Sequence, residues 1–116
     1  MSIETTLNST LLNNAGVAAL VSTRIYPPPV PESAALPYVD YQNVAGSRIS
    51  TLPGVGDAIR ARIQMNCNAT TYAGAVALAD AVIAALEGDG YLELEYDLFD
   101  SETQTHTRIV DWSFIA

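Results

Sequence analysis

The stretch "AIRARIQMNCNATTYAGAVALADAVIAAL" (residues 58–86) decides the fold. Up to residue 69, apolar side chains such as Ile63 and Cys67 alternate with polar ones. This period of two predicts a β-strand over 58–69 with one buried and one polar face. Residues 70–90 then predict a helix that begins at a threonine N-cap and ends at a glycine.

The predicted helix carries a packing stripe and a face of small residues. The stripe follows helical spacing and is predicted to lie against the sheet; it consists of Tyr72, Val76, Ala79, Ile83 and Leu86. The opposite face is rich in alanine and also carries Asp80 and Glu87. Small side chains there allow another element to approach closely.

The segment before this unit predicts a second strand. Residues 38–50 are rich in β-branched and aromatic side chains, which favour strand structure. Gly46 within them indicates a bulge or a twist. Residues 51–57, "TLPGVGD", have the chemistry of a turn, so the two strands are expected to form a hairpin-type connection.

The remaining elements complete the predicted fold. Residues 91–100 and 105–115 flank a turn at 101–104 and predict an acidic C-terminal β-hairpin. Residues 2–13 predict a short amphipathic helix, and 17–21 one or two further helical turns. The sequence therefore predicts a single domain over residues 1–116. Its fold class is α+β, with a mostly antiparallel four-stranded sheet, one long helix packed on a face, and a shorter N-terminal helix.

The net negative charge comes entirely from the last third of the chain. The net charge is −8 over 116 residues, and there is no lysine. Residues 80–116 hold nine acids and one arginine, whereas residues 1–79 hold four acids and four arginines. Binding to a phosphate backbone needs clustered basic residues, so a grip on nucleic acid is not expected. An apolar fraction of 49% against 16% charged residues leaves hydrophobic surface for partner proteins.

Neither a membrane span nor a signal segment is predicted. The most apolar run, residues 72–86, is too short for a span and contains Asp80. The first residues lack the basic and apolar regions of a secretory leader, which indicates a cytoplasmic origin.

Candidate chemistry is sparse. His106 is the only histidine and has no nucleophile motif to serve, so it is expected to be a surface strand residue. Cys67 lies on the apolar side of its strand and is expected to be a small core residue. Glu93, Glu95 and Asp97 would share one face of a strand. They are compatible with a cation site, but a solvated or channel-facing surface accounts for them better, so neither a metal nor another cofactor is predicted.

A proline-rich segment, "RIYPPPVPESAALPY", spans residues 24–38. Its P-x-x-P spacing misses the register of an SH3 ligand by one residue in both orientations. Interleaved apolar residues argue against disorder. We expect residues 27–37 to form a stiff, ordered loop whose middle part protrudes and touches a neighbouring protein through Pro28, Pro29, Val30 and Pro31.

Three blocks in this order resemble a known family. They are "AGVAALVSTRIYP" (15–27), "LPYVDYQ" (36–42) and "RARIQMNCNATTYAGAVALADAVIAAL" (60–86). The chain resembles the small siphophage tail completion proteins, the tail terminator family. The likeness spans nearly the whole chain, and the long proline run is a local departure from it.

The resemblance implies a structural role in the virion. It implies six copies in a homo-hexameric ring at the head-proximal end of the tail tube. Such a ring would contact the major tail tube protein, stop its polymerisation and offer a docking face to the head-completion (stopper) protein. DNA would pass through the lumen without specific binding. The implied location is the neck region of the tail, after synthesis in the host cytoplasm.

Two sets of charged residues could line the lumen or the contacts between copies in such a ring. If the strand over 91–100 lined the lumen, Glu93, Glu95 and Asp97 would repel DNA phosphates and keep the channel from binding DNA. Arg60 and Arg62 lie on the polar face of their strand. They are expected either to form salt bridges within the sheet or to contact the acidic patch of a neighbour in the ring.

Alternative functions remain open at this point. A head–tail connector, a head-completion protein or a minor tail component is a close variant of the terminator. A small acidic metal-dependent enzyme belongs to a different class, and only the carboxylate cluster supports it. A regulatory module that binds through the proline segment is a third possibility.

Overall fold

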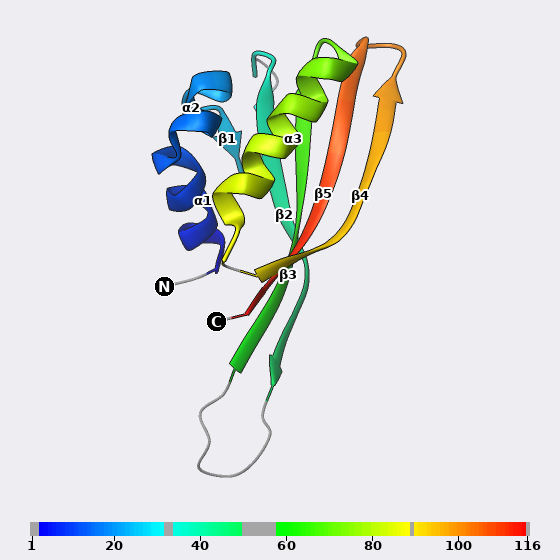
Figure 1. Ribbon diagram of the computed structural model, residues 1–116. Coiled ribbons are helices and arrows are strands. Elements are labelled where there is room, and N and C mark those ends of the chain that lie inside the picture. Colours follow the sequence, from blue (N-terminus) through cyan, green and yellow to red (C-terminus); the bar gives the residue numbers. More distant parts are fainter. Residues whose placement is uncertain (1–2, 32–33, 50–57, 89, 116) are drawn as a thin grey trace.

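The computed structural model describes residues 3–31, 34–49, 58–88 and 90–115 (Figure 1). These residues form three helices and five strands in chain order: α1 (Ile3–Asn13), α2 (Ala15–Val21), β1 (Ile25–Tyr26), β2 (Tyr38–Ile49), β3 (Ala58–Ala69), α3 (Tyr72–Leu86), β4 (Gly90–Asp100) and β5 (Thr105–Ile115). None of the described helices is long and apolar enough to cross a membrane. The predicted turn at 51–57 lies outside the described residues.

The strands form one sheet in the order β1-β2-β3-β5-β4. All neighbours are antiparallel except β1, which runs parallel to β2. The predicted α+β class and mostly antiparallel sheet are confirmed, with a fifth strand added. That strand is only Ile25 and Tyr26, opposite Val39 and Asp40. Two extended residues before a proline carry no periodic pattern, so their pairing could not be seen in the sequence.

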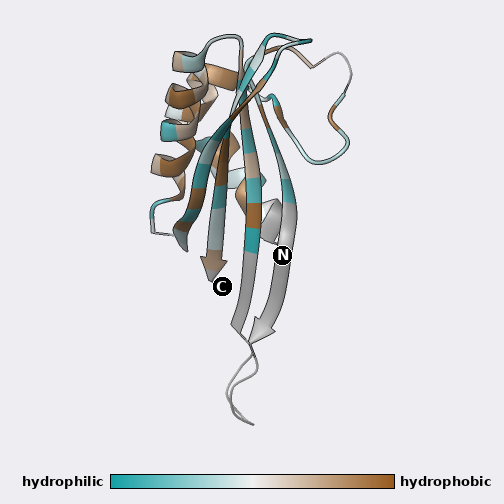
Figure 2. Ribbon diagram, turned by 90° about the vertical axis from the view of Figure 1, so that its right-hand side faces the viewer, coloured by the Kyte–Doolittle hydropathy of each residue, from teal (hydrophilic) through white to brown (hydrophobic). Residues whose placement is uncertain are grey.

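The three helices pack on one face of the sheet (Figure 1). α3 contacts β3 and β5, while α1 and α2 lie beside α3 toward the β1 edge. The core between the layers includes Leu7, Leu11, Val39, Ile63, Met65, Leu78, Val82, Val110 and Trp112. We call this side of the sheet the helix-side face. The opposite side, the open face, carries Asp40, Gln42, Gln64, Asn66 and Asp111, and the β1–β2 connection bows out on this side (Figure 2).

Side-chain caps begin two of the helices. Thr71 accepts a hydrogen bond from the Gly74 backbone N–H at 3.0 Å, so α3 begins after the predicted threonine cap. Asn14 accepts one from the Val17 N–H at 3.1 Å and begins α2.

The packing stripe predicted for α3 is partly right: Ala79 and Leu86 are buried and Ile83 packs against the core, but Ala75, Leu78 and Val82 were not predicted. The buried residues are Ala75, Leu78, Ala79, Val82 and Leu86, whereas Tyr72 is exposed. Val76 and Ile83 are half-buried. Because the helix is apolar on most sides, its sequence does not determine its rotation on the sheet, and packing against β3 and β5 decides it instead.

Candidate functional site

β4 contains a bulge that changes which side chains share a face. The pairing with β5 shifts between Leu92 and Leu94. Before the shift, Leu92 lies opposite Trp112, and after it, Glu95 lies opposite Val110. Both partners belong to the core, so Leu92 and Glu95 both lie on the helix-side face. They are three positions apart, whereas residues that share a face of a regular strand are two or four positions apart.

The bulge separates the three predicted acids. The Glu93 carboxylate accepts a hydrogen bond from Ser113 Oγ at 2.8 Å, on the open face. Glu95 and Asp97 instead contact Arg108 on the helix-side face. The prediction that Glu93, Glu95 and Asp97 share one strand face is therefore wrong, because one extra residue in the strand reverses the alternation.

Arg108 neutralises most of the acidic cluster. Its Nη2 donates to Glu95 Oε1 at 3.2 Å, and its Nη1 donates to both Asp97 oxygens at 3.1 Å. Nη1 also lies 3.4 Å from the Tyr72 hydroxyl. The hydrogen bond to Glu95 is the main cause of the raised pKa of Arg108. The Arg108 and Glu95 side chains are only 21% and 22% exposed, so the pair is largely shielded from water.

Arg62 is engaged within its own chain. Its Nε donates to Asp111 Oδ1 at 2.9 Å, and its Nη2 lies 2.7 Å from Oδ2. This bidentate geometry matches a guanidinium to a carboxylate, and the hydrogen bond to Asp111 raises the pKa of Arg62. The salt bridge within the sheet, one of the two predicted roles, is therefore present. The side chain of Arg60 lies outside the described residues.

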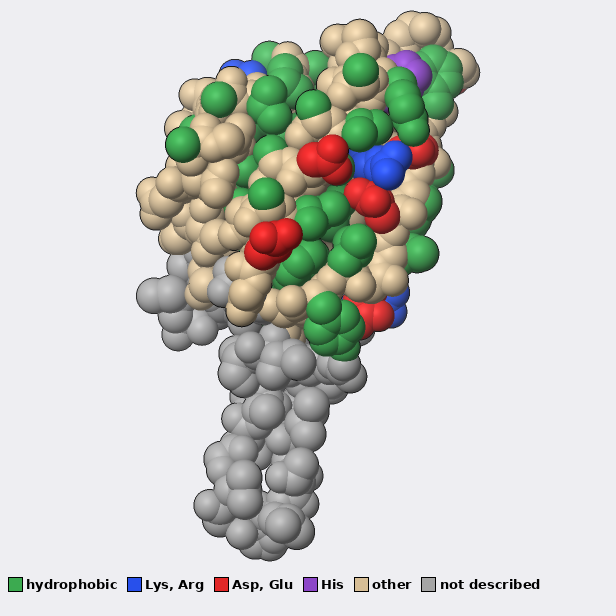
Figure 3. All heavy atoms as spheres, viewed as in Figure 1, with side chains coloured by type: hydrophobic (Ala, Val, Ile, Leu, Met, Phe, Trp, Pro, Cys, Tyr) green, Lys and Arg blue, Asp and Glu red, His purple; other side chains and the backbone are tan. Residues whose placement is uncertain are grey.

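β4 exposes an unusual amount of apolar surface. Among the described residues, most of the large apolar side chains that are exposed belong to this strand: Tyr91, Leu92, Leu94, Tyr96, Leu98 and Phe99, against Leu12, Leu20 and Tyr72 elsewhere. α3 covers β3 and β5, leaving β4 outside the helical layer (Figures 1 and 3). Leu98 and Phe99 are 55% and 52% exposed although they lie on opposite faces. The strand is thus uncovered on both sides.

His106 and Cys67 occupy structural positions. The His106 ring packs 4.6 Å from the Phe99 ring centre and 6.2 Å from that of Tyr72. Cys67 is fully buried, as predicted for a core residue, and burial raises the pKa of its thiol. Within the described residues, no group of three or more His, Cys, Asp or Glu side chains is placed to hold a metal ion.

The proline-rich segment is tied down at its base. Arg24 Nε donates to the Pro37 carbonyl at 2.9 Å, and the Val39 N–H donates to the Arg24 carbonyl at 3.0 Å. The Tyr26 and Tyr38 rings pack at 5.9 Å. Burial is the main cause of the raised pKa of Tyr38. Above this base, Pro28, Pro29 and Pro31 are exposed and Val30 is half-buried.

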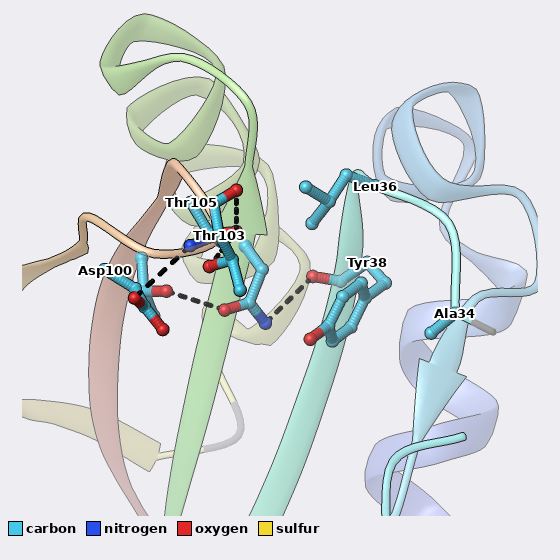
Figure 4. A pocket seen from close by; sticks show the side chains of 8 residues that line it. Ala34, Leu36, Tyr38, Asp100, Thr103 and Thr105 are labelled. Carbon is cyan, nitrogen blue, oxygen red and sulfur yellow. Dashed lines mark hydrogen bonds between the residues drawn. The ribbon is translucent and has the colours of Figure 1, made fainter. Parts of the chain in front are cut away.

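A hydroxyl-rich hollow of about 400 Å³ lies between this segment and the β4–β5 turn (Figure 4). Asn68 links its two sides, because its amide donates to Asp40 Oδ1 at 2.8 Å and its oxygen accepts from Thr107 at 2.7 Å. The lining residues are Ala34, Leu36, Tyr38, Asn68, Asp100, Thr103, Thr105 and Thr107. In Figure 4, Leu36 and Ala34 face Asp100, Thr103 and Thr105 across the opening.

Two features of this surface were not predicted from the sequence. Arg108 was not assigned a role, although it lies directly opposite Asp97 in the hairpin. The apolar residues of β4 were noted only as part of the high apolar fraction of the whole chain. One pattern in the sequence could have predicted their exposure: the strand has large apolar side chains at both odd and even positions, Leu98 and Phe99 among them.

Comparison with known proteins identifies a family and solved structures of related fold. The model of a family described as "Tail completion protein gp17" matches residues 5–116. A solved structure, "Virion of native gene transfer agent (GTA) particle", contains a chain of similar fold, with a TM-score of 0.70 at 22% identity. The match covers 98% of this chain and 93% of that chain. No curated protein matches the sequence.

Proposed function

The chain belongs to the tail completion protein gp17 family, and from this membership we propose that it acts as a tail terminator. A tail completion protein is a structural component of the phage virion, located in the tail and neck region, and not an enzyme. In the proposed role, six copies close into a ring at the end of the tail tube. The ring contacts the major tail tube protein on one side and the head-completion protein on the other.

Family membership carries this proposal, and the exposed surface of β4 supports it. A chain that exposes Leu94 and Leu98 on one face of β4 and Phe99 on the other is more stable when a partner covers them. Contacts between different surfaces of identical chains close into rings when the rotation allows it.

The two faces of the sheet suggest which one lines the lumen. We assign the open face to the DNA channel, because its central strands carry polar and acidic side chains there, including Asp40, Gln64 and Asn66. In this arrangement Glu93 faces DNA, while Glu95 and Asp97 lie on the helix-side face with Arg108. The formal charge of six chains, 6 × −8 = −48, repels phosphates and lets DNA slide without specific binding.

Electron microscopy and native mass spectrometry test the proposed ring. The purified chain is examined alone and after addition to tubes of the tail tube protein from the same phage. We expect six-chain rings with a central hole, and tubes that stop growing once a ring caps them. Binding to the head vertex but not to tube ends would assign the chain to the connector alternative instead. A chain that remains monomeric in both settings would refute the ring.

The proline-rich segment is the second proposed contact surface, toward a neighbouring protein of the neck. Its base is held by Arg24 and Pro37, so its tip is not needed for the fold. Deletion of residues 28–33 should leave the melting temperature within a few degrees of the parent while reducing capped tubes or head joining. The matched control replaces Thr103, at the β4–β5 turn, with alanine. Full assembly by the deletion variant would rule the contact out.

A further inference from the structure

The hydroxyl-rich hollow lies at one end of the sheet. β3 and β4 end beside it, and β2 and β5 begin there. Its two walls come from residues 34–38 and 100–107, on either side of β3 (Figure 4). Tyr38 lies opposite Asn68, and Asn68 lies opposite Thr107, so the floor spans three neighbouring strands. The sheet itself therefore holds the two walls in place.

Asn68 fixes the floor of the hollow. Its side chain is 6% exposed, and its amide nitrogen donates to Asp40 Oδ1 at 2.8 Å and to the carbonyls of Asn66 and Tyr38 at 3.1 and 3.4 Å. Its oxygen accepts the hydroxyl proton of Thr107 at 2.7 Å. Because Thr107 gives its proton to Asn68, its hydroxyl oxygen can act toward a ligand only as an acceptor.

Asp100 adds a negative charge to one wall. Its Oδ1 accepts hydrogen bonds from the backbone N–H groups of Glu102 at 2.9 Å and Thr103 at 3.4 Å, at the start of the β4–β5 turn. Its Oδ2 has no hydrogen-bond partner in the described part of the chain. The hollow therefore offers a carboxylate that is held in position and still has an oxygen available.

No basic side chain of the described residues reaches this carboxylate. The residues that line the hollow include no arginine. The arginines with described side chains are engaged elsewhere: Arg24 by Pro37, Arg62 by Asp111, and Arg108 by Glu95 and Asp97.

The other two arginines lie at the far end of the sheet. Arg48 pairs with Ile59, and Arg60 pairs with Ser47. At a rise of about 3.3 Å per residue, the path along β2 from Tyr38 to Arg48 is roughly 30 Å. An arginine side chain does not span this distance, so a counter-charge for the hollow has to come from outside the chain.

We propose that the hollow receives the side chain of a lysine from another virion protein that docks on this end of the sheet. The inference rests on the proposed role as a tail terminator, which supplies the neighbouring protein, and it names the chemistry of the contact. The chain has no lysine, so a second copy cannot provide this side chain.

The geometry of the hollow favours lysine over arginine. A guanidinium binds a carboxylate best through two parallel hydrogen bonds, which use both oxygens. Oδ1 of Asp100 is already occupied by the turn, which leaves Oδ2 for a compact ammonium group. Leu36 and Ala34 face Asp100 across the opening and offer apolar contact to the four-carbon stem of a lysine (Figure 4).

Zero-length cross-linking identifies the partner. A water-soluble carbodiimide, which joins a carboxylate to an amine, is applied to purified virions that contain this chain, and the linked peptides are identified by mass spectrometry. We expect an amide between Asp100 and a lysine of another virion protein. Because the chain has no lysine, a lysine linked to Asp100 belongs to a different protein. Links through other carboxylates, with Asp100 recovered only unlinked, would overturn the proposal.

An amide substitution tests whether the charge matters. Asp100→Asn keeps an oxygen that can accept from the turn N–H groups and removes only the negative charge. We expect the yield of joined particles to fall by about tenfold, since a charge-assisted hydrogen bond is lost. The matched control is Asp80→Asn, an exposed acid on α3, which changes the net charge equally and should assemble normally. Normal assembly of Asp100→Asn would contradict the proposal.

A binding experiment on the purified chain separates this inference from the terminator role. Nα-acetyl-lysine methylamide is titrated at constant ionic strength and followed by nuclear magnetic resonance. We expect shifts of the Asn68 side-chain amide and of the Glu102 and Thr103 backbone amides, and their loss in Asp100→Asn. The uncharged norleucine analogue should cause none. No shift, or equal shifts with both probes, would overturn the lysine site. A chain that binds the lysine probe but joins no tail would refute only the terminator role.

Discussion

Arg108 offsets much of the negative charge of β4. The acids of β4 suggested a strongly negative surface, but two of them lie within 3.2 Å of this guanidinium. Glu95 Oε2 and Arg108 Nε are buried and have no hydrogen-bond partner among the described residues. The described residues offer no further hydrogen bonds to these two atoms. Loss of either charge therefore leaves the other partly buried and without its counter-charge.

Replacing Arg108 with methionine should destabilise the protein by about 1–2 kcal/mol, because hydrogen bonds to charged groups are lost and Glu95 stays partly buried. Urea unfolding of the single variants and of Arg108→Met/Glu95→Gln forms a double-mutant cycle. We expect the Glu95→Gln change to cost less in the methionine background. Strictly additive effects would show that the pair contributes no coupling energy.

The buried thiol of Cys67 should make the free energy of unfolding depend on pH. Burial raises the pKa of its thiol in the folded state, whereas the unfolded thiol ionises near pH 8.5. The contribution of the neutral buried thiol is therefore fully present below that pH and is lost as pH rises above it.

The free energy of unfolding should fall by about 1 kcal/mol more in the wild type than in Cys67→Ala between pH 8 and pH 9.5. Tyr38 also has a raised pKa, but it titrates at higher pH and is common to both proteins. Urea titrations at several pH values provide the measurement. Parallel pH profiles would mean that water reaches the thiol.

At the scale of elements, Gly90 fixes where β4 joins the sheet. Its φ is +156°, and a Cβ there would lie 1.9 Å from the Ser113 carbonyl oxygen. Gly90→Ala should therefore push the start of β4 away from β5 and cost about 2–3 kcal/mol. Gly88→Ala is the control, because φ is +95° but nothing lies within 4 Å of its Cβ. It should cost about 1 kcal/mol from backbone strain alone. Equal losses in thermal unfolding would exclude the steric explanation.

Local patterns predicted some elements well and failed on others for identifiable reasons. β3 and β5 have the predicted bounds because period-two alternation and turn residues are local signals. The predicted stripe of α3 was only partly right, because a helix apolar on many sides can bury either Tyr72 or Leu78, and only packing selects Leu78. The β4 bulge was missed because no glycine marks the step from Leu92 to Leu94.

The candidate site depended on those missed features. Its residue types were recognisable, since the acids of β4 and Arg62 were singled out from charge alone. Their grouping was not, because the bulge moved Glu93 to the open face. The ion pair between Arg62 and Asp111 required the pairing of β3 with β5, which joins residues far apart in the sequence.

At the scale of the whole molecule, the uneven charge bears on how copies meet. Residues 1–79 are neutral overall, and residues 80–116 carry the full −8. The strand order places acidic β4 at one edge of the sheet and β1 with β2 at the other. A head-to-tail ring therefore alternates acidic and neutral surfaces, whereas any contact between two acidic hairpins opposes association.

Salt separates the two ways in which such a ring could be held together. Between 0.1 M and 1 M salt the Debye length falls from about 10 Å to about 3 Å, which screens repulsion between chains of net charge −8. If apolar contacts of β4 carry the interface, the fraction of six-chain rings should rise with salt in analytical ultracentrifugation. If Arg62 instead binds acids of a neighbour, rings should dissociate as salt rises. Because Arg62 already binds Asp111 in its own chain at 2.7 Å, we expect the fraction of rings to rise with salt.

An Arg62→Glu variant should then form rings whose fraction also rises with salt. If this variant failed to assemble at every ionic strength, the interface would be reassigned to that arginine.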